Sequence, residues 1–558
     1  MPLPSLPPGS RQLATAGGGV DAVRSSAIKP DDYQRAIIEC PDKVIVANAF
    51  AGSGKTTMAQ MYAQARPRSN ILYLCFGKAN QLVAKARFGV NVDCRTGHSL
   101  AYEAIGYRFK ERNQYFIKPQ DFARQLSLTD TRKAAVLLDI LGKWCASNSV
   151  TISAVHLEEV GIKWGFDERE YGVYIAQAKM AWSKITSPGS TVTVLPDFYM
   201  KMWALTHPKL SRYTIIIVDE GQDTAPVLSQ IIEDQTHATR LLIGDQHQSI
   251  FQFRGAINAM ETFSALGATV LKMPKTWRFG QDIADKANKL LSLFKGETTA
   301  IIGAGPASAR RPETKRAVLA RTNAGLIAEA AAVYGRQTHW IGGIKNYKVD
   351  VLVDAFNLST DQHSSIRDPY MRGFRSWSHY KDEAIKMRDG QAQLLIMLVG
   401  RYAKDIPTMV RSFHTNALET EAGAKLVLST MHKAKGLDFD HVTVCEDFHG
   451  LEKALSSLIA TPTEPLDKDH VQEINGLYVA MTRARHQLDL NKESKDFFTN
   501  YDRHVSAVCE ARARARALQS SSTPVSLDTA PEEHAGADTD TFDTFNSASM
   551  EQAPLFGG

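Results

Sequence analysis

The sequence predicts an α/β protein with two parallel-sheet domains, each with a mainly helical insertion, and a disordered C-terminal tail. Three observations lead to this fold class. Short, almost continuously apolar runs recur along the chain, as in strands that are buried on both faces. Several of these runs precede helical patterns, which favours helices on both faces of each sheet. With 558 residues the chain is also too long for one core, and about three or four folding units of ~100–200 residues are expected.

Seven apolar runs are the predicted strands: Val44–Ala47, Ile71–Cys75, Ile215–Val218, Leu241–Ile243, Val318–Ala320, Leu426–Leu428 and Val442–Cys445. Helix formers dominate between Glu103 and Pro196 and between Val349 and Thr420, which predicts the two insertions. The chain therefore begins with a flexible leader (1–26), followed by a first α/β domain (27–102 and 205–275) that contains a helical insertion (103–204). A second α/β domain (276–348 and 421–495) contains a short accessory insertion (349–420). The chain ends with a helical extension (496–517) and a disordered acidic tail (518–558).

Composition excludes several classes of protein. No apolar run approaches the ~18 residues that span a bilayer, and the Pro- and Gly-rich leader lacks the apolar core of a signal peptide. We therefore expect no membrane partner and a cytoplasmic location, in the bacterial cytosol or nucleoid. Six cysteines without a Cys-x-x-Cys pair give little support for zinc or iron–sulfur sites. The net charge is +5 although the tail is acidic, and a basic body with an acidic tail suits a polyanion binder.

A phosphate-binding loop lies between the predicted strand Val44–Ala47 and a helical stretch that begins at Thr57. Gly52 and Gly54 let backbone N–H groups wrap phosphates, and the N-terminus of the following helix favours negative charge. Lys55 is expected to reach the β- and γ-phosphates, and the hydroxyl of Thr56 to bind Mg²⁺. The loop therefore predicts ATP and Mg²⁺ as ligands, and the residues that bind them are Gly52, Ser53, Gly54, Lys55, Thr56 and Thr57.

Two acids follow the buried strand Ile215–Val218. A carboxylate at the tip of such a strand can hold Mg²⁺, and its neighbour can take a proton from an attacking water. We assign Asp219 to the metal and Glu220 to the role of general base. An Asp-Glu pair after a strand is more often a pair of surface carboxylates, but its combination with the phosphate loop favours ATP hydrolysis.

Further motifs follow in order. The run 219–224 is Asp-Glu-Gly-Gln-Asp-Thr, 244–256 is Gly-Asp-Gln-His-Gln-Ser-Ile-Phe-Gln-Phe-Arg-Gly-Ala, 430–439 is Thr-Met-His-Lys-Ala-Lys-Gly-Leu-Asp-Phe, and 478–484 is Tyr-Val-Ala-Met-Thr-Arg-Ala. From Ile28 to Leu490 this order and spacing resemble the UvrD/Rep family of superfamily 1 DNA helicases. Within this family, the runs 75–79, 94–102 and 277–280 most resemble the F-box DNA helicase branch. The resemblance is to the motor part of those helicases only, because no F-box-like segment is apparent in the sequence.

The resemblance implies that both α/β domains are RecA-like. It also implies an ATP-dependent DNA helicase or translocase that moves 3′ to 5′ on single-stranded DNA and acts in DNA repair, recombination control or replication. Its expected partners are single-stranded DNA and tailed duplex DNA. Two alternatives stay open: a nucleotide-dependent DNA-binding switch, and a protein-displacing translocase with little unwinding.

The resemblance also implies roles for residues at the phosphates. The guanidinium groups of Arg254, Arg278 and Arg483 are expected to converge on the γ-phosphate, where such groups can speed phosphoryl transfer by ~10³–10⁵. Gln248 is expected to sense the same phosphate and couple it to DNA. Because Arg278 and Arg483 belong to the second α/β domain, their contact with the phosphate requires the cleft between the domains to close.

The base and sugar of the nucleotide have implied partners as well. Gln34 is expected to recognise the edge of adenine and Trp277 to stack on its face, while Asp438 replaces a Glu that contacts the sugar. Other matched motifs imply contacts to single-stranded DNA, through stacking and phosphate binding. The implied strand-contacting residues are Phe76, Thr96, His98, Phe253, Thr430 and His432.

Two more segments carry hypotheses. Aromatic residues alternate with arginines between Arg367 and Lys381, which predicts either a DNA contact or a small helical core around Phe374 and Trp377. In the tail, Gln552, Leu555 and Phe556 resemble the short Gln-x-x-Leu-Phe peptides by which bacterial proteins bind the replication sliding clamp. They predict a clamp as a partner, although the pair Leu-Phe could also fold back onto the body or bind another protein.

Overall fold

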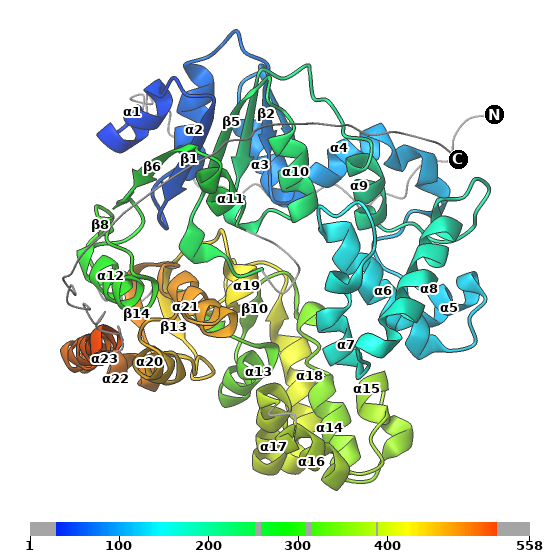
Figure 1. Ribbon diagram of the computed structural model, residues 1–558. Helices are drawn as coiled ribbons and strands as arrows, with labels where there is room; N and C mark the ends of the chain where they lie inside the picture. Colours follow the sequence, from blue (N-terminus) through cyan, green and yellow to red (C-terminus); the bar gives the residue numbers. More distant parts are fainter. Residues whose placement is uncertain (1–28, 252–257, 309–314, 387–388, 522–558) are drawn as a thin grey trace, which may run out of the picture.

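The computed structural model describes residues 29–251, 258–308, 315–386 and 389–521. Its two halves are each built on a six-stranded parallel sheet with flanking helices (Figure 1). The predicted α/β fold class with two parallel sheets is therefore confirmed. The predicted leader and most of the predicted tail lie outside the described residues.

The first sheet has the strand order β3-β2-β4-β5-β1-β6. Its strands are β1 (Val44–Ala49), β2 (Ile71–Leu74), β3 (Val92–Arg95), β4 (Ile215–Asp219), β5 (Thr239–Gly244) and β6 (Thr269–Met273). Its own helices are α1 (Asp32–Glu39), α2 (Lys55–Gln64), α3 (Lys78–Arg87), α10 (Pro226–Glu233) and α11 (Ala259–Ala265). Along β1, Val46 enters one buried cluster while Ile45 and Ala47 enter another, because the sheet is covered on both faces. Such burial explains the continuous apolar runs.

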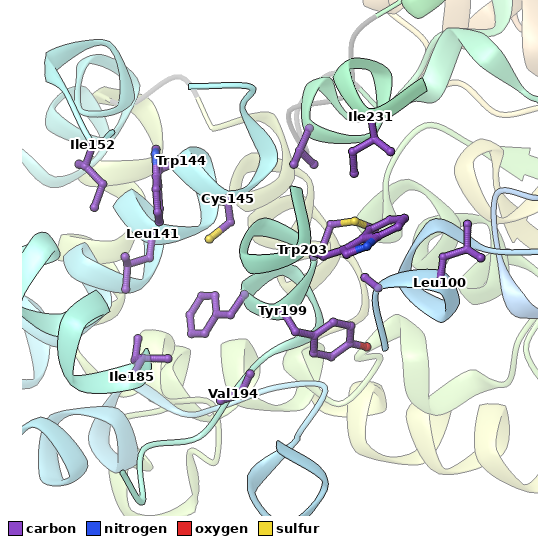
Figure 2. Close-up of a cluster of buried hydrophobic side chains, with 14 of the residues drawn as sticks. Leu100, Leu141, Trp144, Cys145, Ile152, Ile185, Val194, Tyr199, Trp203 and Ile231 are labelled. Atoms are coloured by element: carbon purple, nitrogen blue, oxygen red, sulfur yellow. The ribbon is translucent and has the colours of Figure 1, made fainter. Parts of the chain in front are cut away.

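The chain between β3 and β4 forms the first helical insertion. Its helices are α4 (Gly97–Ala104), the 3₁₀ helix η1 (Gly106–Arg112), α5 (Pro119–Leu126), α6 (Thr131–Ala146), α7 (Glu158–Trp164), α8 (Glu168–Thr186) and α9 (Pro196–Ala204). Trp144 from α6 and Tyr199 and Trp203 from α9 belong to one buried cluster (Figure 2), which also contains Val46 and Leu72 of the sheet. The insertion and the first sheet therefore share a single core.

The second sheet has the order β11-β10-β12-β9-β13-β14. Its strands are β9 (Arg316–Ala320), β10 (Thr338–Trp340), β11 (Ala417–Leu418), β12 (Leu426–Thr430), β13 (Phe439–Val444) and β14 (Ala484–Asp489). Beside it lie the short strands β7 (Lys275–Thr276) and β8 (Ile302–Gly303), and the helices α12 (Gln281–Lys295), α13 (Asn323–Ala332), α19 (Met431–Ala434), α20 (Leu451–Ala460) and α21 (Lys468–Met481). Phe50 and Ala51, which follow β1, pack into the core of this second half.

The second insertion is also helical. It contains α14 (Val351–Ser359), α15 (Pro369–Arg372), α16 (Trp377–Lys386), α17 (Gly390–Tyr402) and α18 (Ile406–Asn416). Phe374 and Trp377 pack against its buried cluster, and both rings contact Tyr380, with centroids 5.0 and 5.4 Å away. These contacts favour the helical-core interpretation of this segment over the DNA contact.

Two helices follow β14: α22 (Lys492–Thr499) and α23 (Tyr501–Ser521), which continues past the limit of 517 expected from the sequence. Across the described part of the chain, every helix is too short or too polar to cross a membrane.

Candidate nucleotide site

The loop between β1 and α2 contains two glycines with left-handed backbones. Gly52 and Gly54 have φ angles of +75° and +82°, which favour glycine. A Cβ on Gly52 would lie 2.5 Å from Thr276 Oγ1 and 2.6 Å from Arg278 Cβ, so the segment after β6 approaches the loop backbone directly. The buried hydroxyl of Ser53 has no hydrogen-bond partner among the described residues. A glycine loop at a helix N-terminus with an unpaired hydroxyl fits a polyphosphate.

Two acids face this loop from the carboxyl end of β4. Lys55 begins α2, and its Nζ lies 3.1 Å from Glu220 Oε2. Asp219 is the last residue of β4, and its Oδ2 accepts a 2.6 Å hydrogen bond from the Tyr73 hydroxyl. The structure therefore brings the predicted lysine and both predicted acids together at one edge of the sheet. Tyr73, on the neighbouring strand β2, is a partner that the sequence analysis did not identify.

The two acids have opposite pKa shifts. Burial and the Glu220 carboxylate raise the pKa of Asp219 above its usual range. Burial alone would raise the pKa of Glu220, but the ammonium groups of Lys55 and Lys435 bring it well below its usual range. Burial alone would lower the pKa of Lys55, but Glu220 and Asp219 raise it. Glu220 is therefore ionised, whereas a cation bound at Asp219 would compete with a proton.

The backbone of Glu220 is itself unusual. Its φ angle is +53°, and such conformations of non-glycine residues cost about 1–3 kcal/mol and cluster at functional sites. Two donors hold the side chain, because Gln222 Nε2 donates a 2.6 Å hydrogen bond to Glu220 Oε2, the same oxygen that pairs with Lys55. The carboxylate is thus fixed beside the phosphate loop.

A chain of hydrogen bonds crosses from the phosphate loop to the second half. The Ala51 N–H donates to the Tyr478 hydroxyl over 3.2 Å, and that hydroxyl donates to Asp245 Oδ2 over 3.0 Å. Gln248 Nε2 donates to the same carboxylate over 2.7 Å, and its Oε1 accepts a 3.1 Å bond from Arg483. Arg483 is only 1% exposed. The predicted pair Gln248 and Arg483 is therefore joined at the junction of the two halves.

Arg278 lies beside Arg483 at this junction. Arg278 Nη1 donates a 2.9 Å hydrogen bond to the Thr482 carbonyl, and its Nε lies 3.8 Å from Asp438 Oδ2. Asp438 also accepts a 2.8 Å hydrogen bond from Arg485. Burial and the charge of Arg278 lower the pKa of Arg483 to about 9, and burial lowers the pKa of Arg278 as well. A buried cation next to a partly buried one favours a bound anion.

The predicted adenine-binding residues flank the glycine loop. Gln34, in α1, is buried, and its Nε2 donates a 3.3 Å hydrogen bond to the Ser53 carbonyl. A Cβ on Gly54 would lie 3.1 Å from Gln34 Nε2 and 4.0 Å from Trp277 Cδ1, while the Trp277 side chain is 49% exposed. An exposed indole and an amide on either side of the loop can take a purine base. The predicted hydroxyl residues lie in the first turn of α2: Thr56 and Thr57.

A row of aromatic rings crosses the same junction. Phe76, just after β2, is 44% exposed, and its ring stacks on Phe251 with centroids 5.3 Å apart. Phe251 lies 5.8 Å from the ring of His432 in α19. Phe251 thus connects Phe76 and His432, which are both predicted strand-contacting residues. The sequence analysis did not single out Phe251 itself. Its signal was present, because Phe251 belongs to the same motif as the predicted Phe253.

Of the four other predicted strand-contacting residues, three lie in the described part of the chain. The Thr96 hydroxyl caps α4 by accepting the Ser99 N–H. His98 is exposed, and its Nε2 lies 2.8 Å from Asp197 Oδ1. Thr430 is buried and immediately precedes α19. Each of these three residues therefore has a defined place in the fold, and the imidazole ring of His98 lies at the surface.

Lys435 is a third residue that the sequence analysis did not single out, although it lies in the quoted run 430–439. Its ammonium group pairs with the buried carboxylate of Asp223 and donates a 2.6 Å hydrogen bond to the Gln248 carbonyl. The lysine comes from the second half and both partners from the first. It therefore connects the aromatic row to the residues around the phosphate loop.

Some predicted residues cannot be located. Arg254 and Phe253 lie in the segment 252–257, and the proposed clamp-binding residues lie in the tail; both segments are outside the described residues. The tail residues concerned are Gln552, Leu555 and Phe556.

Two family models match the chain. The UvrD/REP helicase N-terminal domain matches residues 199–266, and the UvrD-like helicase C-terminal domain matches residues 374–495. The first match contains the two acids and Gln248, and the second contains Lys435 and Arg483. The resemblance to UvrD/Rep helicases that the sequence motifs predict is confirmed.

Two curated relatives are F-box DNA helicases. F-box DNA helicase 1 of Gallus gallus is 29% identical over 476 residues, which cover 79% of this chain and 47% of the relative. F-box DNA helicase protein 1 of Schizosaccharomyces pombe is 28% identical over 507 residues, which cover 82% of this chain and 57% of the relative. The chain thus spans about half the length of these relatives. Both are eukaryotic, so they give no support to the bacterial location expected from the sequence.

Proposed function

We propose that this UvrD-like chain is a DNA-dependent ATPase that moves 3′ to 5′ along single-stranded DNA and unwinds duplexes. The observation that supports this most is the hydrogen-bonded pair Gln248–Arg483, which joins the two sheet halves and is linked through Asp245 and Tyr478 to the phosphate loop. A nucleotide bound there contacts both halves. Hydrolysis can therefore change how the halves sit against each other, which is what a motor requires.

Each residue at the site has a separate proposed role in ATP hydrolysis. Lys55 would leave Glu220 for the phosphates of ATP, which frees the carboxylate to accept a proton from water. Bound Mg²⁺, held by Thr56 and Asp219, would neutralise charge on the β- and γ-phosphates. Arg278 and Arg483 would stabilise the charge that develops on the transferred phosphoryl group. We propose the same role for Arg254.

Single-stranded DNA would lie over the aromatic row Phe76–Phe251–His432. Stacking on such rings tolerates any base, so we expect little sequence preference. Lys435 lies under this row, with its Nζ 5.4 Å from the centre of the Phe251 ring, and it also binds Gln248. A change at the γ-phosphate can therefore reach the DNA through two residues.

The finer proposals rest on the resemblance to the family. They are the 3′ to 5′ direction, a role in DNA repair, recombination control or replication, and the domain limits set from the sequence. Clamp binding through Gln552, Leu555 and Phe556 stays a prediction, and neither the family models nor the two relatives support it.

Two assays test the proposed function. ATPase activity is measured with and without single-stranded DNA, and strand displacement is measured on duplexes with a 3′ or a 5′ tail. We expect strong stimulation by single strands and unwinding from the 3′ tail. Unwinding from the 5′ tail alone would contradict the direction. Absence of stimulation would instead favour the DNA-binding switch, and stimulation with displacement of a bound protein but no unwinding would favour the translocase.

Tyr73 is a positioning residue for Asp219, because its hydroxyl donates to the carboxylate proposed to bind Mg²⁺. This hydrogen bond lowers the pKa of Asp219, against burial and Glu220, which raise it. In Tyr73→Phe the pKa of Asp219 therefore rises further, and protons compete better with Mg²⁺. We expect the Mg²⁺ concentration for half-maximal ATPase activity to rise about two- to tenfold, the value of one hydrogen bond, and the acid limb of the pH profile to move to higher pH.

The control for this prediction is Tyr334→Phe, which removes the hydroxyl of an exposed tyrosine far from the acids in sequence. If the Mg²⁺ dependence and the acid limb of Tyr73→Phe both match the wild type, Tyr73 does not position Asp219.

A further inference from the structure

Two neighbouring aromatic side chains on the first insertion lie almost entirely in solvent. Tyr115 is 90% exposed and Phe116 is 70% exposed, in the short segment between η1 and α5. Tyr107, in η1, is a further aromatic residue with half of its surface exposed. Single exposed apolar residues are common, but adjacent aromatic residues that are this exposed mark a binding surface.

The backbone that carries these rings is firmly held. The Arg112 guanidinium donates to the Ile185 and Val192 carbonyls over 2.9 and 2.6 Å. Asn113 pairs with Val194 in a parallel bridge. On the other side of the two rings Ile117 is buried, and Pro119 begins α5. The rings therefore project from a rigid base, so ordering them for binding costs little entropy.

Helix α9 connects this segment to the proposed DNA surface. At its N-terminus Asp197 lies 2.8 Å from His98. Tyr199, two residues later, packs against Tyr102 of α4 with ring centroids 5.8 Å apart (Figure 2 shows Tyr199). The segment that carries the exposed rings is tied to the start of this helix, because the Gln114 N–H donates a 3.1 Å hydrogen bond to the Val194 carbonyl, two residues before α9. The segment with the exposed rings and His98 therefore both lie against the N-terminal end of α9.

The charge of the segment suits a polyanion. Arg108, Lys110 and Lys118 are exposed, and the guanidinium of Arg108 lies 5.9 Å from the Tyr107 ring. Glu111 is the one exposed acid between residues 106 and 118, and Lys110 pairs with it over 3.6 Å. Aromatic rings between cations are the usual composition of surfaces that bind single-stranded nucleic acid.

We propose that the segment 107–118 is a second strand-binding surface, which extends the single-stranded DNA track of the motor from His98 further along the first insertion. Unpaired bases stack on Tyr115 and Phe116, while Arg108, Lys110 and Lys118 contact phosphates. The occupant is a single strand, because the faces of paired bases inside a duplex are not accessible to protruding rings. This inference rests on the proposed function, since it lengthens the same DNA site.

The test is a titration of fluorescent oligothymidylates of about 8 and about 16 nucleotides, within the range of common strand-binding site sizes. We expect Tyr115→Ala/Phe116→Ala to weaken binding of the longer oligonucleotide about 5- to 100-fold, the effect of losing one stacked base or more. Binding of the shorter one should stay near wild type, because it fits on the motor track alone. The variant Tyr115→Phe/Phe116→Tyr keeps both rings and should bind like the wild type.

The matched control is Val155→Ala/Ile162→Ala, which truncates two exposed apolar side chains elsewhere on the same insertion. It should bind both oligonucleotides like the wild type. If the alanine variant at 115 and 116 keeps wild-type affinity for the longer oligonucleotide, the proposal is wrong, and the rings then mark a protein-binding surface. Equal loss for a blunt duplex would also overturn it. Failure of the wild type to bind either oligonucleotide would contradict the proposed function itself.

Discussion

Lys55→Ala is expected to lower ATP hydrolysis at least about a hundredfold, the effect of removing one fixed electrostatic contact from a charged transition state. The ammonium group of Lys55 pairs with Glu220 over 3.1 Å, and Lys55 begins α2 directly after the glycine loop. Without it, the phosphates lose a positive partner and the two acids lose their counter-ion. The measurement is the steady-state ATPase rate at saturating single-stranded DNA.

DNA affinity without nucleotide should change little in this variant, because we assign Lys55 to the phosphates of ATP and not to the DNA strand. The matched control is Lys43→Ala, which removes the same charge from an exposed lysine just before β1 and should hydrolyse ATP like the wild type. Hydrolysis by Lys55→Ala near the wild-type rate would remove the nucleotide-site assignment altogether.

Glu220→Gln should bind ATP and Mg²⁺ and hydrolyse ATP about 10²–10⁴-fold more slowly, as expected when a general base is lost. Glutamine keeps the size of the side chain but accepts no proton at neutral pH. Asp219 still holds the metal, so nucleotide affinity should survive. Binding of a fluorescent ATP analogue and single-turnover hydrolysis separate the two effects.

Asp219→Asn is the contrasting variant and should lose Mg²⁺-dependent nucleotide binding. Glu39→Gln, at the exposed end of α1, is the control for the loss of one negative charge. If nucleotide affinity collapses in Glu220→Gln while Asp219→Asn retains it, the two acids have exchanged roles.

The sequence predicted those strands that are buried on both faces. The apolar runs of β1, β4 and β12 leave no alternative to an interior position. Strands β3 and β6 were missed because they lie at the edges of the first sheet, and their partly exposed side chains mix apolar and polar residues. An edge strand has no continuous apolar signal.

The residues of the candidate site also divide into those that a local sequence pattern predicts and those that it does not. Lys55 and Glu220 were predicted because phosphate chemistry fixes their types within short runs of sequence. Tyr73 and Lys435 were not, because their roles come from partners far away in the chain, Asp219 and Asp223. Local sequence cannot reveal such pairings. Tyr115 and Phe116 escaped notice for a related reason, since only the fold shows that the two rings are exposed.

The position of β1 has a consequence for synthesis on the ribosome. Its hydrogen-bonded neighbours are β5 and β6, which begin at residues 239 and 269. At about 5–20 residues per second, the apolar β1 stays unpaired for roughly 10 to 45 s of translation. Nascent chains that stop before residue 239 should therefore aggregate or bind chaperones, whereas chains released after residue 273 have both partners for the strand that carries the phosphate loop.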